Sequence, residues 1–304
     1  MKAPVVLFVY NRLDHTMNVI DSLSKNLGAP DTDLYVFSDA AKTENGQDKV
    51  NAVREYIRKT DWRDGFKKVT IVESEKNKGL AKSIIGGVTK ILEEYGKVIV
   101  IEDDLVLSPY FLDYMNGALD YYKDVENIWA ISGYSFPMKS LKNYPHDVFY
   151  SYRGCSWGWA TWLDRWEKTD WEVRDYDKLM ADKAWKKRFN RGGADLTGML
   201  GLQMEGKINS WAIRWVFTQS NLDMYTVYPK NSYILNDGCD GSGTHVGDTD
   251  EYSTSIEAGV QQCKFERLSI DKKIAREFWY KYSDTLDKKI KRNLKKIFRK
   301  KNCK

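Results

Sequence analysis

The sequence has 304 residues, of which 42% are hydrophobic and 30% charged. This balance is typical of soluble globular proteins with a sizeable core and excludes wholesale disorder. No window holds the roughly 18 to 20 consecutive apolar residues of a membrane span. The apolar start at 4–10 is too short for a signal-peptide core, so it predicts a strand instead.

The net charge of +5 is unevenly distributed along the chain. Residues 288–304 contain ten Lys or Arg and no acid, so the remaining residues sum to −5. A basic, nucleic-acid-binding body is therefore disfavoured. Within this tail, Ile290, Leu294, Ile297 and Phe298 share one helical stripe among the cations, which suits the surface of an anionic membrane. The alternative is a solvated basic tail.

The four cysteines lie far apart, at Cys155, Cys239, Cys263 and Cys303, and none forms a CxxC pair. This spacing argues against a zinc site and against a disulfide framework. Both observations fit a reducing compartment, so we expect a cytoplasmic protein.

Strand-like and helix-like segments alternate through the first hundred residues. Runs of β-branched and aromatic residues predict buried strands, and apolar residues spaced three or four apart predict helices. The predicted strands cover 4–10, 33–37, 68–73 and 97–101, and the predicted helices cover 15–25, 47–59 and 79–95. This alternation predicts an α/β fold with an open, mostly parallel sheet, flanking helices and right-handed crossovers.

The rest of the chain is less regular. An aromatic, Gly-containing stretch at 150–171 predicts an irregular segment facing a ligand, and the Gly-, Asp- and Ser-rich stretch at 236–249 predicts a flexible loop. No linker rich in Pro or Ser divides the body. Further helices are predicted at 110–123, 181–190, 196–204 and 210–221, and further strands at 128–132 and 227–235.

Polar clusters follow three of the predicted parallel strands. They are Asn11-Arg12, Asp39 and the triplet Glu102-Asp103-Asp104. In open α/β sheets, ligands bind beyond the carboxyl ends of the strands. These clusters should therefore converge on one binding site.

The acidic triplet is the sharpest chemical signal. Three acids directly after a buried strand repel one another unless a cation offsets their charge. Mg²⁺ and Mn²⁺ prefer such oxygen ligands and bridge them to substrate phosphates. An acidic cap on the following helix is the alternative.

Residues 98–115, VIVIEDDLVLSPYFLDYM, resemble the donor-site segment of the GT-A glycosyltransferases, with its DXD-like acidic motif. The likeness is to the N-acetylglucosaminyltransferase I type and to family-2-like bacterial enzymes of surface-polysaccharide synthesis, and it runs through about residues 4–250. It includes Asn11-Arg12, the strand ending in Ser38-Asp39, NKGLAKS at 77–83, Gly158-Trp159 and the GSGTH loop at 241–245.

The resemblance implies roles for individual residues. Asp104 would hold Mn²⁺ or Mg²⁺ on the donor diphosphate, and Glu102 and Asp103 would contact the nucleotide sugar. Asp39 would contact the nucleobase of the donor. Nucleotide-facing cations would be Arg12 and Lys82, with Asn11 beside them; the alternative for each cation is a solvated surface position.

The chain departs from the resembled family at the expected catalytic base. In Ser210-Trp211-Ala212-Ile213-Arg214-Trp215, Ala212 stands where the family has a carboxylate. Because inverting transfer needs a carboxylate at the attacking hydroxyl, other candidates are needed. They are Asp240, ranked first, then Glu205 and Asp237. Ala212 is also compatible with different acceptor chemistry or with a member that does not catalyse.

The predicted loop 236–249 would form a lid over bound donor, with His245 contacting the diphosphate or the metal. A purely structural histidine is the alternative. Three tryptophans, Trp157, Trp159 and Trp211, could stack on sugar faces, although a core role is equally open for each.

We therefore expect a GT-A-like domain at 1–255 and a helical, basic C-terminal extension at 256–304. The domain would comprise a nucleotide-binding half at 1–107 and an acceptor-binding half at 108–255. It would move a hexose or N-acetylhexosamine from a UDP-sugar to a glycan, which a lipid could carry, at the inner membrane face and with inversion. The rivals are a nucleotidyltransferase and a non-catalytic sugar- or nucleotide-binding or membrane-active protein.

Overall fold

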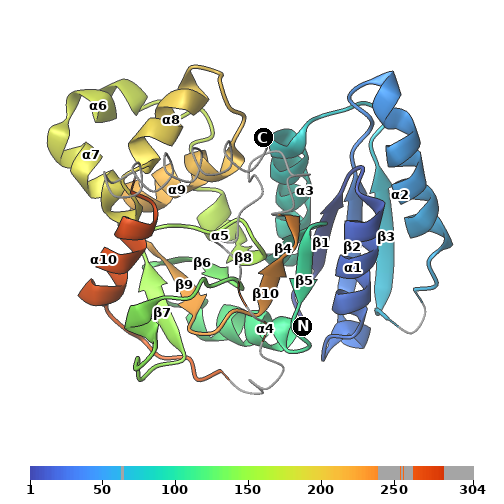
Figure 1. Ribbon diagram of the computed structural model, residues 1–304, viewed down its shortest axis with the longest axis horizontal. Coiled ribbons are helices and arrows are strands. Elements are labelled where there is room, and N and C mark those ends of the chain that lie inside the picture. Colours follow the sequence, from blue (N-terminus) through green and yellow to red (C-terminus); the bar gives the residue numbers. More distant parts are fainter. Residues whose placement is uncertain (63–64, 239–253, 255, 257–262, 284–304) are drawn as a thin grey trace, which may run out of the picture.

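The computed structural model describes residues 1–62, 65–238, 254, 256 and 263–283 (Figure 1). In the first half, strands and helices alternate as the sequence predicts. The strands are β1 (Val5–Val9), β2 (Asp33–Ser38), β3 (Lys68–Glu73) and β4 (Lys97–Glu102), and the helices are α1 (Leu13–Ser24), α2 (Gln47–Lys59) and α3 (Leu80–Tyr95), with short 3₁₀ turns η1 (Ala29–Asp31) and η2 (Glu44–Gly46).

The second half adds more strands and a group of shorter helices. Its elements are β5 (Leu105–Leu107), α4 (Phe111–Tyr122), β6 (Ile128–Ser132), η3 (Lys139–Leu141), β7 (Val148–Ser151), β8 (Trp159–Trp162), α5 (Leu163–Trp166), α6 (Tyr176–Ala181), α7 (Lys183–Phe189), η4 (Asn190–Gly192), α8 (Leu196–Met204), α9 (Trp211–Asn221), β9 (Tyr225–Pro229), β10 (Ile234–Asn236) and α10 (Lys272–Lys281). No helix among the described residues is both long and apolar enough to cross a membrane.

Within the described residues, eight strands form one sheet in the order β3-β2-β1-β4-β8-β6-β9-β7, and β5 and β10 form a separate antiparallel pair. The first four strands are parallel to one another, and β6 is parallel to β9. Only β8 and β7 run antiparallel to their neighbours in the large sheet. The predicted α/β class with an open, mostly parallel sheet is confirmed.

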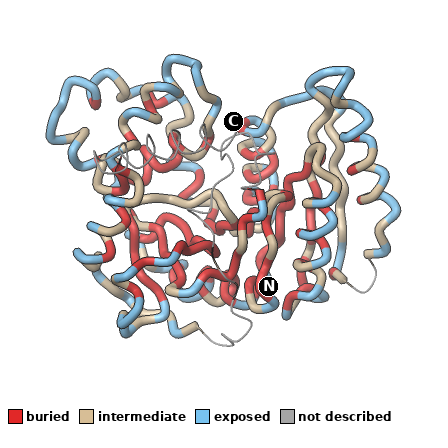
Figure 2. The backbone as a smooth tube through the Cα atoms, viewed as in Figure 1, coloured by how far each residue is buried: buried red, intermediate tan, exposed pale blue. Residues whose placement is uncertain are grey.

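Alternate residues of the central strands face two separate cores. Val5, Leu7 and Val9 pack beneath α1, α2 and α4, whereas Val6 and Phe8 pack beneath α3, α5 and α9. Because both faces are covered, the central strands are buried along their length, as Figure 2 shows. This burial fixes the positions of the residues at the strand ends.

Three predicted elements differ from the structure. The stretch at 150–171 is only partly irregular, because residues 159–162 form β8 between β4 and β6. This strand forms because the segment pairs with two strands that are distant in the sequence. The helix expected at 181–190 is two helices, because the Asp182 side chain accepts hydrogen bonds from the amides of Ala184 and Trp185 and so caps a new helix. The strand expected at 227–235 is split between β9 and β10.

Residues 263–283 contact the body of the protein. Phe265 packs against the ring of Tyr114, and Ile274 and Phe278 of α10 are buried in the same core, where the Phe278 ring contacts those of Phe136 and Tyr228. Residues 263–283 are therefore part of the packed body. The predicted basic stripe at 290–298 lies outside the described residues.

Candidate functional site

A cleft of about 1020 Å³ opens at the carboxyl ends of β1, β2 and β4. One wall is the amino-terminal half of α3 with the loop before it, and the other is the segment 207–212 that leads into α9. Of the residues predicted from the sequence, nine line this cleft: Asn11, Arg12, Asp39, Lys82, Glu102, Asp103, Asp104, Trp157 and Trp211. The convergence expected from the parallel strands is thus present in the structure.

Arg12 neutralises part of the acidic triplet. Its guanidinium forms a short hydrogen bond with the Asp103 carboxylate and a second one, of 3.1 Å, with Asp104. The Asp103 side chain is only 6% exposed and that of Arg12 20%. Two acids therefore share one cation in a largely desolvated position, where such contacts are strong.

Burial dominates the protonation chemistry of the triplet. Burial, reinforced by the Asp104 and Asp103 carboxylates, raises the pKa of Glu102 to about 8. Burial also raises the pKa of Asp103, against the opposing influence of Arg12. For Arg12, burial would lower the pKa, but the two aspartates outweigh it and raise the pKa.

The segment after β10 closes one side of Asp104. The Asp237 amide donates to the Asp104 carbonyl at 2.8 Å, and the Gly238 amide donates to the Asn236 side chain at 2.9 Å. A Cβ at Gly238 would lie 2.4 Å from a carboxylate oxygen of Asp104. Only glycine therefore allows the backbone to approach this carboxylate so closely.

The donor set fits a hard divalent cation. Among the described residues, Asp103 Oδ2 is buried without a hydrogen-bond partner, and the three carboxylates are offset by direct contact with one guanidinium only. Oxygen ligands of this kind suit Mg²⁺ or Mn²⁺. In the described part of the chain, no group of three or more His, Cys, Asp or Glu is arranged so that it could hold a metal ion.

Asp39 shapes the loop before α3. Its carboxylate accepts hydrogen bonds from the backbone amides of Lys78 and Gly79 at 2.8 to 3.1 Å, and from the Asn77 side chain at 3.2 Å. Gly79 has φ 73°, a left-handed conformation that favours glycine. Asp39 thus holds one cleft wall in place.

Cations line the cleft beyond those predicted. Besides Arg12 and Lys82, the lining includes Lys42, Lys78, Lys90 and Lys207. Lys82 and Lys90 lie eight residues apart on α3, about 12 Å along the helix axis, and neither forms an ion pair with a described residue. The cleft is therefore suited to a ligand that carries more than one negative charge.

The wall opposite α3 carries aromatic rings and is uncharged apart from Lys207. Ser156, Trp157, Ser210, Trp211 and Ala212 line it. Trp157 is partly exposed and its ring packs edge-on against Tyr134. Trp211 also lines the cleft but is only 3% exposed, so most of its ring is buried.

Trp159 does not line the cleft. It is 1% exposed, and its ring lies 4.9 Å from that of Trp211 and 4.6 Å from that of Trp215, measured between centroids. These rings belong to a tryptophan cluster on the α3 side of the sheet. Trp159 is therefore packed in the core, away from the cleft.

The candidate bases do not line the cleft among the described residues. Glu205 forms an ion pair with Lys207 at 2.6 Å, and Asp237 lies 3.6 Å from the His15 ring. Neither is part of the cleft wall. The third candidate base, Asp240, lies outside the described residues. So do His245, the predicted contact of the diphosphate or the metal, and most of the predicted lid.

No protein-family model and no curated protein matches this sequence. Among solved structures, residues 1–349 of S. aureus TarS are similar at 12% identity and a TM-score of 0.43, over 77% of this chain and 60% of that one. The same protein in complex with UDP gives 12% identity, the same coverage and a TM-score of 0.41.

The mannosyltransferase PcManGT from Pyrobaculum calidifontis, in complex with GDP-Man and Mn²⁺, is similar at 14% identity and a TM-score of 0.40, over 73% of this chain and 70% of that one. The present chain spans about 60% of the length of the TarS fragment to which it is similar. Likenesses of this size concern the path of the chain and say nothing of its activity.

Proposed function

We propose that this protein is a metal-dependent glycosyltransferase of GT-A type that takes a sugar from a nucleoside diphosphate sugar. One observation carries the proposal: Glu102, Asp103 and Asp104 stand at the tip of a buried strand, inside a cleft whose other charged residues are mainly cations. A metal-bound diphosphate would complement both sets of charges at once. The resemblance of residues 98–115 to the donor-site segment points the same way.

The residues of the cleft divide the task of holding the donor. Asp104, with Asp103 behind it, would hold a divalent ion, which when bound supplies positive charge to the departing diphosphate. Lys82 would add charge from α3, and Arg12 would remain within reach of the same phosphates. Asp39 would fix the loop that borders the nucleobase of the donor, and Glu102 would contact the sugar of the donor.

The acceptor is proposed to be a glycan, bound along the wall opposite α3 that includes Trp157 and Ser210. Transfer of a hexose or N-acetylhexosamine from UDP, with inversion, follows from the resemblance, as does a role in surface-polysaccharide synthesis at the inner membrane face. An inverting enzyme needs a base near the acceptor. We retain Asp240, Asp237 and Glu205 as candidates, with His245 as a ligand of the diphosphate.

Donor hydrolysis tests the proposal without knowledge of the acceptor. The full chain with Mn²⁺ should slowly release UDP from UDP-glucose or UDP-N-acetylglucosamine, and Asp104→Ala should abolish this release. Asp113→Ala is a matched control, because Asp113 is an exposed acid of α4 outside the cleft, and it should behave like the wild type.

Two outcomes would replace the proposal with its rivals. Saturable binding of the nucleotide sugars without any release of UDP would identify a non-catalytic binder. Release of pyrophosphate from a nucleoside triphosphate in the presence of a sugar phosphate would identify a nucleotidyltransferase.

A further inference from the structure

Helix α10 has one face buried in the body. Ile274 and Phe278 are 1% and 3% exposed, and the Phe278 ring lies 5.0 Å from that of Phe136 and 5.3 Å from that of Tyr228. Tyr282, just after the helix, stacks under the Arg153 guanidinium at 3.7 Å. These contacts fix the rotation of α10 about its axis.

The opposite face carries three cations followed by two aromatic rings. Lys272, Lys273, Arg276, Trp279 and Tyr280 are all exposed, and their spacing places them along one stripe of the helix. Trp279 is 40% exposed and Tyr280 46%. We call this stripe the α10 face.

The acids near this stripe are turned away from it. Asp271 accepts hydrogen bonds from the amides of Lys273 and Ile274 and so caps the helix. The Glu277 carboxylate accepts from the amides of Lys139 and Ser140, on the body side. Lys272, Lys273 and Arg276 form no ion pair with any described residue, so within the described part of the chain the α10 face presents positive charge without a compensating acid.

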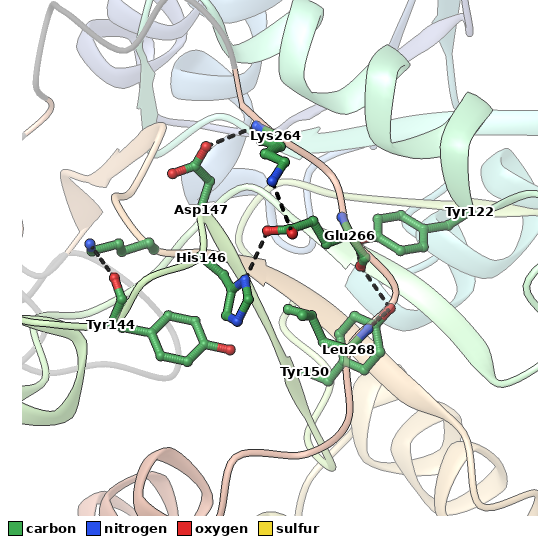
Figure 3. Close-up of polar contacts among 9 residues, drawn as sticks. Tyr122, Tyr144, His146, Asp147, Tyr150, Lys264, Glu266 and Leu268 are labelled. Carbon is green, nitrogen blue, oxygen red and sulfur yellow. Dashed lines mark hydrogen bonds and ion pairs between the residues drawn. The ribbon is translucent and has the colours of Figure 1, made fainter.

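The segment before α10 is tied to the body by a network of polar contacts (Figure 3). Glu266 lies 2.8 Å from the His146 ring, and its carbonyl accepts from the Tyr122 hydroxyl at 2.7 Å. The Lys264 amide donates to Asp147 at 2.9 Å. A helix held at its start and along its buried face presents its exposed stripe as a rigid surface.

We propose that the α10 face docks on an anionic phospholipid bilayer. Exposed Trp and Tyr beside Lys and Arg are the residues that favour the membrane-water interface. The occupant is further indicated by the chain that follows: within 21 residues after Ser283 it carries ten more Lys or Arg, and this charge would add to that of the stripe at an anionic surface.

This inference does not depend on the proposed chemistry. A protein that binds sugars without transferring them would dock in the same way, and a soluble transferase would not. Vesicle binding and UDP release therefore report separately on the two proposals.

Vesicle co-sedimentation of the full chain tests the docking surface. The protein should bind vesicles that contain phosphatidylglycerol and not vesicles of phosphatidylcholine alone. The triple variant Lys272→Gln, Lys273→Gln, Arg276→Gln should lower the partition coefficient on the order of 100-fold, since each cation contributes about fivefold. The double variant Trp279→Ala, Tyr280→Ala should lower it roughly tenfold through lost apolar contact.

A matched control removes the same charge from the opposite margin of the molecule. Lys49, Lys68 and Lys76 are exposed residues near α2 and β3, which lie across the molecule from α10 in Figure 1. Their triple change to Gln should leave vesicle binding within about twofold of the wild type, because these cations would not face the bilayer. Melting temperatures confirm that each variant is folded.

Three results would overturn the proposal. The first is equal binding to neutral and anionic vesicles. The second is unchanged binding of both α10 variants when removal of residues 284–304 abolishes it, which would assign binding to the tail alone. The third is retention on heparin or an acidic protein with no binding to anionic vesicles.

Discussion

Removal of the Arg12 side chain should lower the stability of the protein and increase the stabilisation that manganese gives. Arg12→Ala leaves the 6%-exposed Asp103 side chain and its two acidic neighbours without a directly bonded cation. Loss of one partner of a buried ion pair costs about 3 to 5 kcal/mol. The lower end applies here, because burial already raises the pKa of Glu102 and Asp103, so that these acids can take up protons and relieve part of the repulsion.

The expected loss translates into a measurable shift in melting temperature. A chain of 304 residues has an unfolding entropy of about 0.6 kcal/mol/K, so a loss of about 3 kcal/mol lowers the melting temperature by about 5 °C. Arg12→Lys should recover part of this, because a single ammonium cannot contact both aspartates with the geometry of a guanidinium.

Manganese should restore more stability to Arg12→Ala than to the wild type. In the wild type the ion competes with the guanidinium for Asp103 and Asp104, whereas in the variant these ligands are available. The assay is a thermal melt over a range of manganese concentrations, with Lys82→Ala as a control cation that does not contact the triplet. If Arg12→Ala melts like the wild type, or if manganese stabilises both equally, the counter-ion role of Arg12 is refuted.

Three further changes probe the surroundings of the triplet and the attachment of α10. Gly238→Ala places a Cβ 2.4 Å from the Asp104 carboxylate and should weaken manganese binding about tenfold, measured by titration. Asp39→Asn removes an acceptor from the loop before α3 and should raise the KM for the donor about tenfold with little change in kcat. His146 and Lys264 lower the pKa of Glu266, so its contribution to stability is present above the unfolded pKa and is lost as pH falls. The melting temperatures of Glu266→Gln and wild type should therefore differ at pH 7 and converge as the pH falls through the lowered pKa of Glu266.

The regular first half of the fold could be predicted because local pattern and tertiary environment agree there. Val5 to Val9 are apolar at every position, as a strand covered on both faces requires, and the structure buries all five. The four residues of β8 carry no such signal. Trp159–Trp162 forms a strand because β4 and β6 lie on either side of it. Pairing between segments that are distant in the chain cannot be predicted from the local sequence.

The part of the site that is formed by residues directly after the parallel strands could be predicted from the sequence. Asp39 and the acidic triplet follow strands, so topology alone brings them to one edge of the sheet. Lys207 and Ser210 come from a segment about a hundred residues further along, and only the packed structure brings them into the cleft. Composition likewise could not distinguish Trp159, in the core, from Trp157, at the cleft wall.

The structure explains how three adjacent acids can be retained at the end of a buried strand. Strand β4 is held by β1 on one side and β8 on the other, so Glu102 cannot retreat into solvent without breaking the sheet. The Asp237 amide holds the carbonyl of Asp104 in the same way. The acids are therefore fixed by backbone contacts that do not involve their charge, and Arg12 offsets only part of their repulsion. A cationic ligand that enters the cleft gains the attraction of preorganised carboxylates without first having to order them, and this favours binding at the triplet over binding at any flexible acidic surface of the protein.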